Sequence, residues 1–221
     1  MLFPSLCVDD FFNDIDYIKK QAEQFRFHRT DHVPGYRTDN IALLDYELYN
    51  YINLKVLAAL YPCQLSDLKF DAFSTFQITD SNPYDGWVHK DDVDSILTAI
   101  VYLTDCTAGT SVYKPKDPKK IMKFDDNSDG GKHTYFGNYE DATEDDLKNV
   151  ESNRKFVNDH YDESIIFKGR RNRMVCFDAR EYHAAHINTE NKQRMIFITF
   201  FKQIWIDGEA IYYHVPSVKS L

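Results

Sequence analysis

The side chains with the clearest chemical potential in this sequence are two histidines and one aspartate. His89 and Asp91 stand two residues apart in the segment Trp87–Asp91, and His183 follows far downstream. Two neutral imidazoles and one carboxylate that leave coordination positions open suit non-haem Fe(II), whereas Zn(II) favours additional His or Cys ligands. We therefore predict that His89, Asp91 and His183 are metal ligands and form the catalytic centre.

The order of the flanking segments supports this hypothesis more than the His-x-Asp spacing does. A chain with 8 His and 35 acidic residues contains such a pair by chance fairly often. Here, however, an apolar segment at 174–177 is followed by a short turn, by His183 and by a return segment that carries Arg194. Arginine offers a planar fork of donors that matches a carboxylate, and inside a barrel it needs an anionic partner. Arg194 is thus predicted to bind a 2-oxo acid co-substrate.

Strands are the elements that must position these residues. Residues two apart on a strand point to the same face, so His89 and Asp91 can reach one metal from the end of one strand. From about residue 69, apolar residues alternate or form short continuous runs, which predicts strands at 70–78, 96–103, 111–113, 165–167, 174–177, 195–206 and 210–215. The predicted fold is mainly β with N-terminal helices, namely a double-stranded β-helix or jelly roll.

Two amphipathic helices are predicted before the strands. In 9–26, apolar residues recur at three- to four-residue spacing, and Asp9 or Asp10 can cap the start. In 45–60 a single apolar stripe runs along the segment, which Pro62 ends. Both helices are expected to cover a sheet by packing.

The chain is predicted to form one domain over residues 1–221. Residues 1–68 provide helical support, and residues 69–113 and 164–215 provide the jelly-roll strands. Between them, residues 114–163 are rich in Lys, Asp, Asn and Gly and contain one short helix that starts near Thr143. A stretch this long between strands is usually functional or mobile, so it is predicted to be an insertion that acts as a lid over the barrel.

Composition limits the cell compartment and the partners. The net charge of −9 disfavours nucleic acid as a partner, although this charge does not exclude a local basic patch. The 4 Cys form no CxxC pair, which favours free thiols in a reducing compartment. Neither a signal peptide nor a membrane-spanning segment is recognisable, so the protein is expected to be cytoplasmic and to have no membrane partner.

The chain resembles the 2-oxoglutarate- and Fe(II)-dependent oxygenases, especially their prolyl-hydroxylase-like branch and its small microbial and viral members. The matching segments are the His-x-Asp pair, 99–104, 109–111, 172–177, His183 and Arg194. The resemblance implies a dioxygenase, a hydroxylase with Fe(II) and 2-oxoglutarate as cofactors, in which Arg194 pairs with the distal carboxylate of 2-oxoglutarate. Some relatives carry Ser two residues after that Arg, where this chain has Ile196. Tyr102 is therefore expected to supply the second hydrogen bond.

His186 is an alternative to His183 as the distal metal ligand. We favour His183 because it lies a short distance beyond the end of the strand at Phe177, whereas His186 begins the next apolar stretch. His186 would then be a donor beside the ligands or a polar residue at the rim. Asp178 is predicted to form the turn rather than to bind metal.

Two other functions compete with the oxygenase hypothesis. One is a metal enzyme of the cupin or hydrolase type that does not use 2-oxoglutarate, and the other is a jelly-roll binding module without catalysis. The partners implied by the resemblance are O2 and an unidentified substrate, with a peptide or a small molecule favoured. A prolyl or other amino-acid side chain is the first expectation for the hydroxylated group, since fold alone does not select a substrate.

Overall fold

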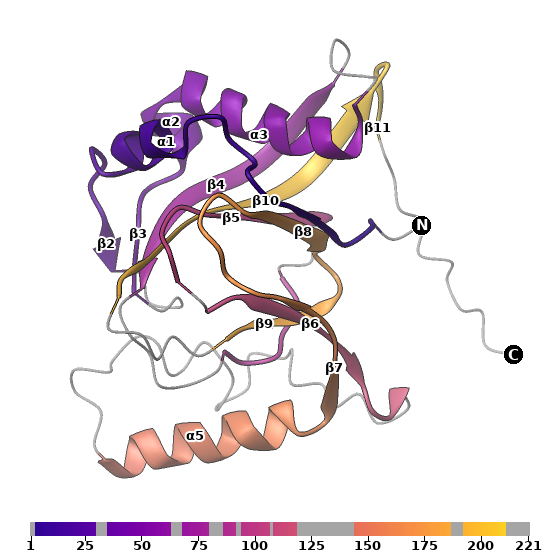
Figure 1. The fold of residues 1–221 in the computed structure, drawn as a ribbon. Coiled ribbons are helices and arrows are strands. Elements are labelled where there is room, and N and C mark those ends of the chain that lie inside the picture. The colour runs from indigo at the N-terminus through magenta and orange to yellow at the C-terminus, as the bar shows by residue number, and fades with distance from the viewer. Residues whose placement is uncertain are drawn as a thin grey trace, which may run out of the picture.

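Two antiparallel sheets and a small number of helices make up the described part of the chain (Figure 1). The structure is a computed structural model, and it describes residues 3–29, 35–62, 68–79, 86–91, 94–106, 108–118, 144–186 and 192–210. The predicted class, mainly β with helices near the N-terminus, is confirmed at this level. No helix in these ranges is long and apolar enough to cross a membrane.

The larger sheet has 8 strands. Along its hydrogen-bonded path, the strands are β1 (Leu6–Val8), β8 (Met174–Asp178), β5 (Leu97–Tyr102), β10 (Arg194–Ile206), β4 (Lys69–Thr79), β3 (Tyr36–Arg37) and β2 (His28–Arg29). In addition, β11 (Glu209–Ala210) pairs with β10. The smaller sheet has 3 strands, in the order β7 (Tyr161–Phe167), β6 (Thr110–Pro115) and β9 (Tyr182–Ala185).

The predicted strands from residue 70 onward are present, and their ends shift by a few residues. For the last one, 210–215, the structure shows only β11, and residues 211–215 lie outside the described ranges. Sequence reasoning missed β1, β2, β3 and β9, which have 2 to 4 residues each. Such short strands carry too few alternations to be recognised, and the partners of β1 and β9 are also distant in sequence.

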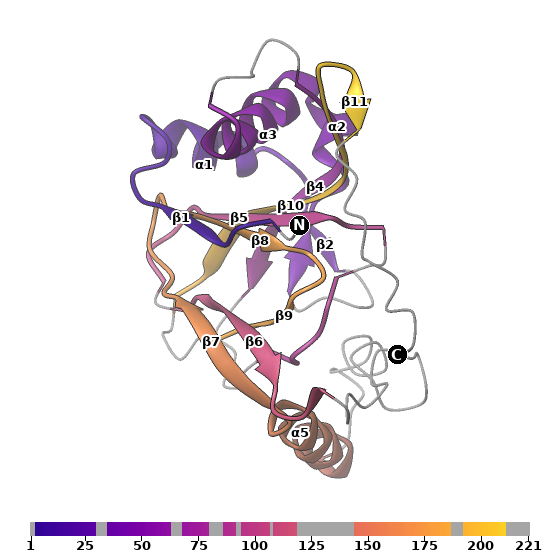
Figure 2. The ribbon, with the colours of Figure 1, turned by 90° about the vertical axis from the view of Figure 1, so that its right-hand side faces the viewer.

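Three helices, α1 (Ile15–Ala22), α2 (Ile41–Leu44) and α3 (Tyr46–Leu60), cover one face of the larger sheet (Figure 2). The predicted helix at 45–60 corresponds to α3, and the Asp45 carboxylate accepts a hydrogen bond from the Leu48 amide at 2.9 Å. The main hydrophobic core lies between these helices and the sheet. The smaller sheet faces the opposite side of the larger sheet, and α5 (Glu144–Asn158) lies beyond it.

The predicted cap of the first helix was wrong. The helix starts only after Asp14, whose carboxylate accepts a hydrogen bond from the Tyr17 amide at 2.9 Å. A helix cannot run through Asp10, because this residue has a positive φ of 50°. In addition, the Phe12 amide bonds to the Asn172 side chain at 2.8 Å, which ties this segment to the start of β8 instead.

The segment 114–163, which was predicted to be an insertion, also contains parts of two paired strands. Its described residues include the end of β6 and the start of β7, which stay paired as far as Pro115 and Tyr161. The predicted short helix exists as α5 and has 15 residues. Residues 119–143 lie outside the described ranges. Of the four cysteines, Cys63 also lies outside them. The other three cysteines, Cys7, Cys106 and Cys176, form no disulfide bond.

Candidate metal centre

The two candidate histidine ligands lie directly opposite each other because two segments pair side by side. The His89 amide donates to the His183 carbonyl at 3.0 Å, and the His183 amide donates back to His89 at 2.8 Å. Further backbone bonds join Gly86 to Ala185 and Asp91 to Ala179. The residues of a mutually hydrogen-bonded antiparallel pair project to the same side. The two imidazole ring centroids are accordingly 4.4 Å apart.

The three predicted ligands converge at one point. Asp91 Oδ1 lies 3.4 Å from His183 Nε2 and 4.0 Å from His89 Nε2. One ligand atom from each residue lies within 4.8 Å of the other two, so the group could hold a metal ion. Within the described ranges no other group of three or more His, Cys, Asp or Glu residues does so. Three ligands of this chemistry leave coordination positions open for other molecules.

Backbone carbonyls orient both histidines in the same way. His89 Nδ1 lies 2.7 Å from the Trp87 carbonyl oxygen, and His183 Nδ1 lies 3.0 Å from the Glu181 carbonyl oxygen. A carbonyl only accepts, so each Nδ1 must carry the proton and donate it. Each Nε2 therefore keeps its lone pair for a metal, which is the arrangement typical of metal-binding histidines.

Asp91 is held as a carboxylate. Burial by itself raises the pKa of Asp91. In the absence of a metal, the attraction of His183 and His89 in their protonated forms and a hydrogen bond from the Thr98 hydroxyl hold that pKa well below its usual range. The Thr98 hydroxyl bonds to Oδ2, and Oδ1 faces the two imidazoles. Sequence reasoning missed Thr98, because it lies in a continuous apolar strand and no local pattern marks it as a partner of Asp91.

Arg194 is a buried cation with an unmet hydrogen-bonding need. Its side chain is only 7% exposed, and its Nε atom has no hydrogen-bond partner among the described residues. Its guanidinium carbon lies 5.3 Å from the centre of the Tyr102 ring. The Tyr102 hydroxyl, fully buried, lies 3.1 Å from the Thr110 hydroxyl. An orphaned buried donor is costly unless a ligand supplies the acceptor.

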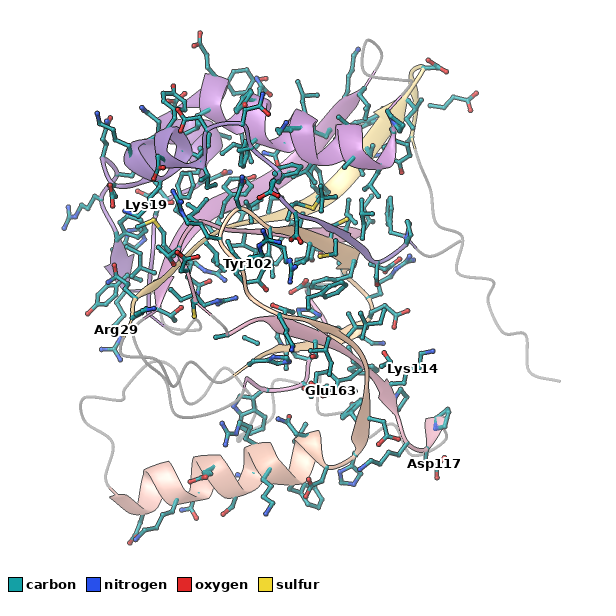
Figure 3. The ribbon with its side chains drawn as sticks, in the orientation of Figure 1. Lys19, Arg29, Tyr102, Lys114, Asp117 and Glu163 are labelled. Atoms are coloured by element: carbon teal, nitrogen blue, oxygen red, sulfur yellow. The ribbon has the colours of Figure 1, made fainter. Side chains whose placement is uncertain are left out.

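Arg194 and the candidate ligands lie on the same face of the larger sheet. Alternate residues of β10, namely Arg194, Ile196 and Ile198, project to one side. The two isoleucines belong to the cluster between the two sheets that also contains Tyr102 and Phe177. The Phe177 ring centroid lies 4.8 Å from that of His183. Figure 3 shows Tyr102 in this interior, between the sheets.

His186 and Asp178 are engaged elsewhere. His186 Nε2 contacts the Ser111 hydroxyl and lies 3.2 Å from Glu163 Oε1, outside the ligand group. Asp178 is fully buried, and its carboxylate accepts from the Arg180 amide at 3.0 Å as well as from the Arg180 guanidinium. The prediction that Asp178 forms the turn is confirmed. The geometry favours His183 over His186 as the distal ligand.

The helix within the predicted insertion also supports the His89 segment. Asn158, the last residue of α5, accepts a hydrogen bond from the Val88 amide at 2.9 Å and donates one to the Gly86 carbonyl at 3.0 Å. Val88 packs in a small core with Val157 of the same helix. The end of α5 thus fixes the backbone on either side of Trp87, close to a candidate ligand.

Close backbone approach makes Gly86 necessary at its position. A Cβ atom there would lie 2.9 Å from the Ala185 nitrogen and 3.1 Å from its oxygen. We expect Gly86→Ala to push the His89 segment away from β9, to lower stability by about 1–3 kcal/mol and to weaken metal binding. Titration of the purified variant with Fe(II) under anaerobic conditions measures the second effect.

Lys90→Ala is the matched control in the same segment. The Lys90 ammonium lies 4.4 Å from the centre of the Tyr182 ring, and the residue is not among the candidate ligands. This variant should bind metal like the wild type. Unchanged metal affinity in Gly86→Ala would contradict the importance of this close approach.

A second arginine near the ligands was also missed. Arg37 lies on β3, outside the segments that sequence patterns mark as strands. Its Nε and Nη2 atoms both donate to Gln77 Oε1, at 3.1 and 3.0 Å. Burial lowers the pKa of Arg37 to about 10, while the charge of Asp91 opposes this effect. Only the pairing of β3 with β4 brings this side chain near the ligands, and sequence spacing carries no trace of it.

Solved structures with a similar overall fold include enzymes that depend on 2-oxoglutarate. The carbocyclase SnoK from nogalamycin biosynthesis aligns with a TM-score of 0.54 at 15% identity, over 97% of this chain and 83% of SnoK. HygX from Streptomyces hygroscopicus, with nickel and 2-oxoglutarate bound, gives 0.54 at 10% identity, over 89% and 82%. A prolyl hydroxylase from Trichoplax adhaerens in complex with a hypoxia inducible factor peptide gives 0.51 at 10% identity, over 89% and 82%. At these identities the likeness establishes the fold.

The chain belongs to a family of unknown function, DUF6445, whose sequence model matches residues 3–195. The match ends just after Arg194 and includes the three candidate metal ligands. No curated protein matches the sequence.

Proposed function

We propose that this protein is an Fe(II)- and 2-oxoglutarate-dependent oxygenase with a double-stranded β-helix fold. The observation that carries the proposal is the orphaned Nε of Arg194, on the same interior face as the group of His89, Asp91 and His183. A metal centre of this type needs a bound co-substrate, and a buried arginine needs an anion. One dicarboxylate that reaches from metal to guanidinium meets both needs.

Each side chain has a definite role in this proposal. His89, Asp91 and His183 bind the metal through Nε2, Oδ1 and Nε2, and the carbonyls of Trp87 and Glu181 fix the two imidazoles. Arg194 binds the distal carboxylate of 2-oxoglutarate, and the Tyr102 hydroxyl supplies the second hydrogen bond in place of the Ser that Ile196 replaces. Thr110, which already contacts Tyr102, orients that hydroxyl.

The cofactors supply the chemistry that protein side chains lack. Fe(II) with 2-oxoglutarate and O2 oxidises an unactivated C–H bond, while 2-oxoglutarate is decarboxylated to succinate. Hydroxylation of a small molecule or of an amino-acid side chain in a peptide is the expected reaction. The solved relatives with this fold include a carbocyclase, an epimerase and a prolyl hydroxylase, so the fold favours no single branch.

We also infer that residues 114–163 act as a lid over the site. The described part of this segment supports the idea, because Asn158 at the end of α5 bonds to the backbone beside His89. A lid joined to a ligand segment in this way can couple its own closure to the position of the ligand. Residues 119–143, which would form the rest of the lid, lie outside the described ranges.

An anaerobic titration tests the proposed function. The protein is loaded with Fe(II), and 2-oxoglutarate is then added while the visible spectrum is followed. We expect the weak metal-to-ligand charge-transfer band of a 2-oxo acid chelated to Fe(II). A folded protein that binds Fe(II) but shows no band would contradict the proposal and favour a cupin-type or hydrolytic metal enzyme. Absence of Fe(II) binding would favour a binding module without catalysis.

A further inference from the structure

Arg37 reaches the interior face of the larger sheet from the edge strand β3. It lies opposite Gln77 of β4, which in turn lies opposite Ile196 of β10. Residues opposite one another in paired strands project to the same side, and Ile196 belongs to the cluster between the sheets. The Arg37 guanidinium carbon lies 6.0 Å from the centre of the Phe200 ring, which also packs against that cluster.

The guanidinium extends toward the metal ligands rather than toward Arg194. Phe200 lies opposite Thr98 in the pairing of β10 with β5, and Thr98 bonds to Asp91. Arg194 lies six residues from Phe200 on the same strand, or about 20 Å along an extended backbone. The two arginines therefore serve different regions of the interior, with the metal ligands on the Arg37 side.

The charge of Arg37 has no anionic partner in the described part of the chain. Its side-chain hydrogen bonds go to one neutral oxygen, Gln77 Oε1, and no described carboxylate lies within ion-pair distance. Its Nη1 has no described partner. Asp91 does not neutralise it by direct contact, because the Asp91 oxygens face Thr98 and the two imidazoles. The side chain is also partly exposed, so that a molecule from outside can reach it.

We propose that Arg37 is the substrate-binding residue of this site and that it binds a carboxylate group of the molecule oxidised at the metal. This inference rests on the proposed function, since Arg194 is already assigned to 2-oxoglutarate. A carboxylate fits because it is planar, accepts two parallel N–H bonds and carries one negative charge, which matches one guanidinium. A phosphate dianion would leave excess negative charge next to Asp91.

Nitrogen-15 NMR of arginine guanidinium groups tests the proposal directly. The protein is labelled on arginine, loaded with diamagnetic Zn(II) and saturated with 2-oxoglutarate, so that Arg194 is already occupied. Acetate is then added at constant ionic strength, with acetamide as the uncharged control and inorganic phosphate as the competing anion. Loss of signals in Arg37→Lys and Arg194→Lys assigns the two resonances.

We expect acetate to shift the Arg37 resonance saturably, acetamide to leave it unchanged and phosphate to bind more weakly. Gln77→Glu provides a matched variant, because a carboxylate in place of the Gln77 amide would occupy the guanidinium from within. In this variant the acetate shift should be lost while the charge-transfer band with Fe(II) and 2-oxoglutarate remains. Arg37→Met should likewise keep the band.

Four results would each overturn the proposal. A non-saturable acetate response, or one that persists in Gln77→Glu, would show that Arg37 does not bind the carboxylate, and tighter binding of phosphate would assign the site to another class of substrate. Loss of metal binding in Arg37→Met would make Arg37 a structural counter-charge of Asp91. The Arg194 resonance reports separately on the proposed function, because failure of that function would leave it insensitive to 2-oxoglutarate.

Discussion

His183→Ala is expected to abolish Fe(II) binding at the candidate centre and, with it, all turnover. The change removes one of three ligand atoms and leaves Asp91 Oδ1 facing only His89 Nε2. Removal of a residue that merely orients a ligand costs roughly 10- to 100-fold in metal affinity. Loss of the ligand itself should therefore exceed the upper end of that range. Anaerobic Fe(II) titration and the charge-transfer band with 2-oxoglutarate measure the effect.

His186→Ala is the matched control, since it removes an imidazole three residues away. His186 contacts Ser111 and Glu163, and its ring is not among the converging ligand atoms. We expect this variant to keep the Fe(II) affinity and the band of the wild type. If His186→Ala lost metal and His183→Ala kept it, the distal ligand would have to be reassigned. Equal loss in both variants would point to a general disturbance of β9 and its surroundings.

The strands and the candidate ligands could be predicted because their signals are local or follow a fixed order. Apolar runs mark β5, β8 and β10 individually, and His89, Asp91, His183 and Arg194 follow one another in an order that resembles the 2-oxoglutarate-dependent oxygenases.

The remaining features depend on contacts that no local pattern reports. Thr98 supports Asp91 through one side-chain hydrogen bond, and Arg37 faces the interior only because β3 joins the edge of β4. The start of α1 was misplaced for the same reason, since Asn172, about 160 residues away, holds the backbone at Phe12. Side chains that meet only in the folded chain leave no recognisable spacing pattern in the sequence. Thr98 and Arg37, which would complete the site, are of this kind.

Arg194→Met is expected to remove most of the affinity for 2-oxoglutarate while Fe(II) binding remains. Truncation of one partner of a buried charged pair typically costs about 2–5 kcal/mol, which corresponds to a loss of roughly 30-fold to several thousand-fold in affinity. Arg194→Lys should keep the charge but lose the planar fork, so its affinity should lie between those of the wild type and Arg194→Met. Titration of the charge-transfer band measures these affinities.

Thermal unfolding distinguishes a cofactor-binding arginine from a structural one. Without 2-oxoglutarate, the wild type carries the unpaired Nε of Arg194 in its interior, so Arg194→Met should unfold at an equal or higher temperature. With metal present, 2-oxoglutarate should raise the unfolding temperature of the wild type, because it binds only the folded state, and should change that of the variant little.

Arg180→Met is the contrasting control. It removes the ion-pair partner of the fully buried Asp178 carboxylate, so it should lower stability with or without 2-oxoglutarate. If Arg194→Met behaved like Arg180→Met, Arg194 would be a structural residue and the 2-oxoglutarate assignment would fall with it.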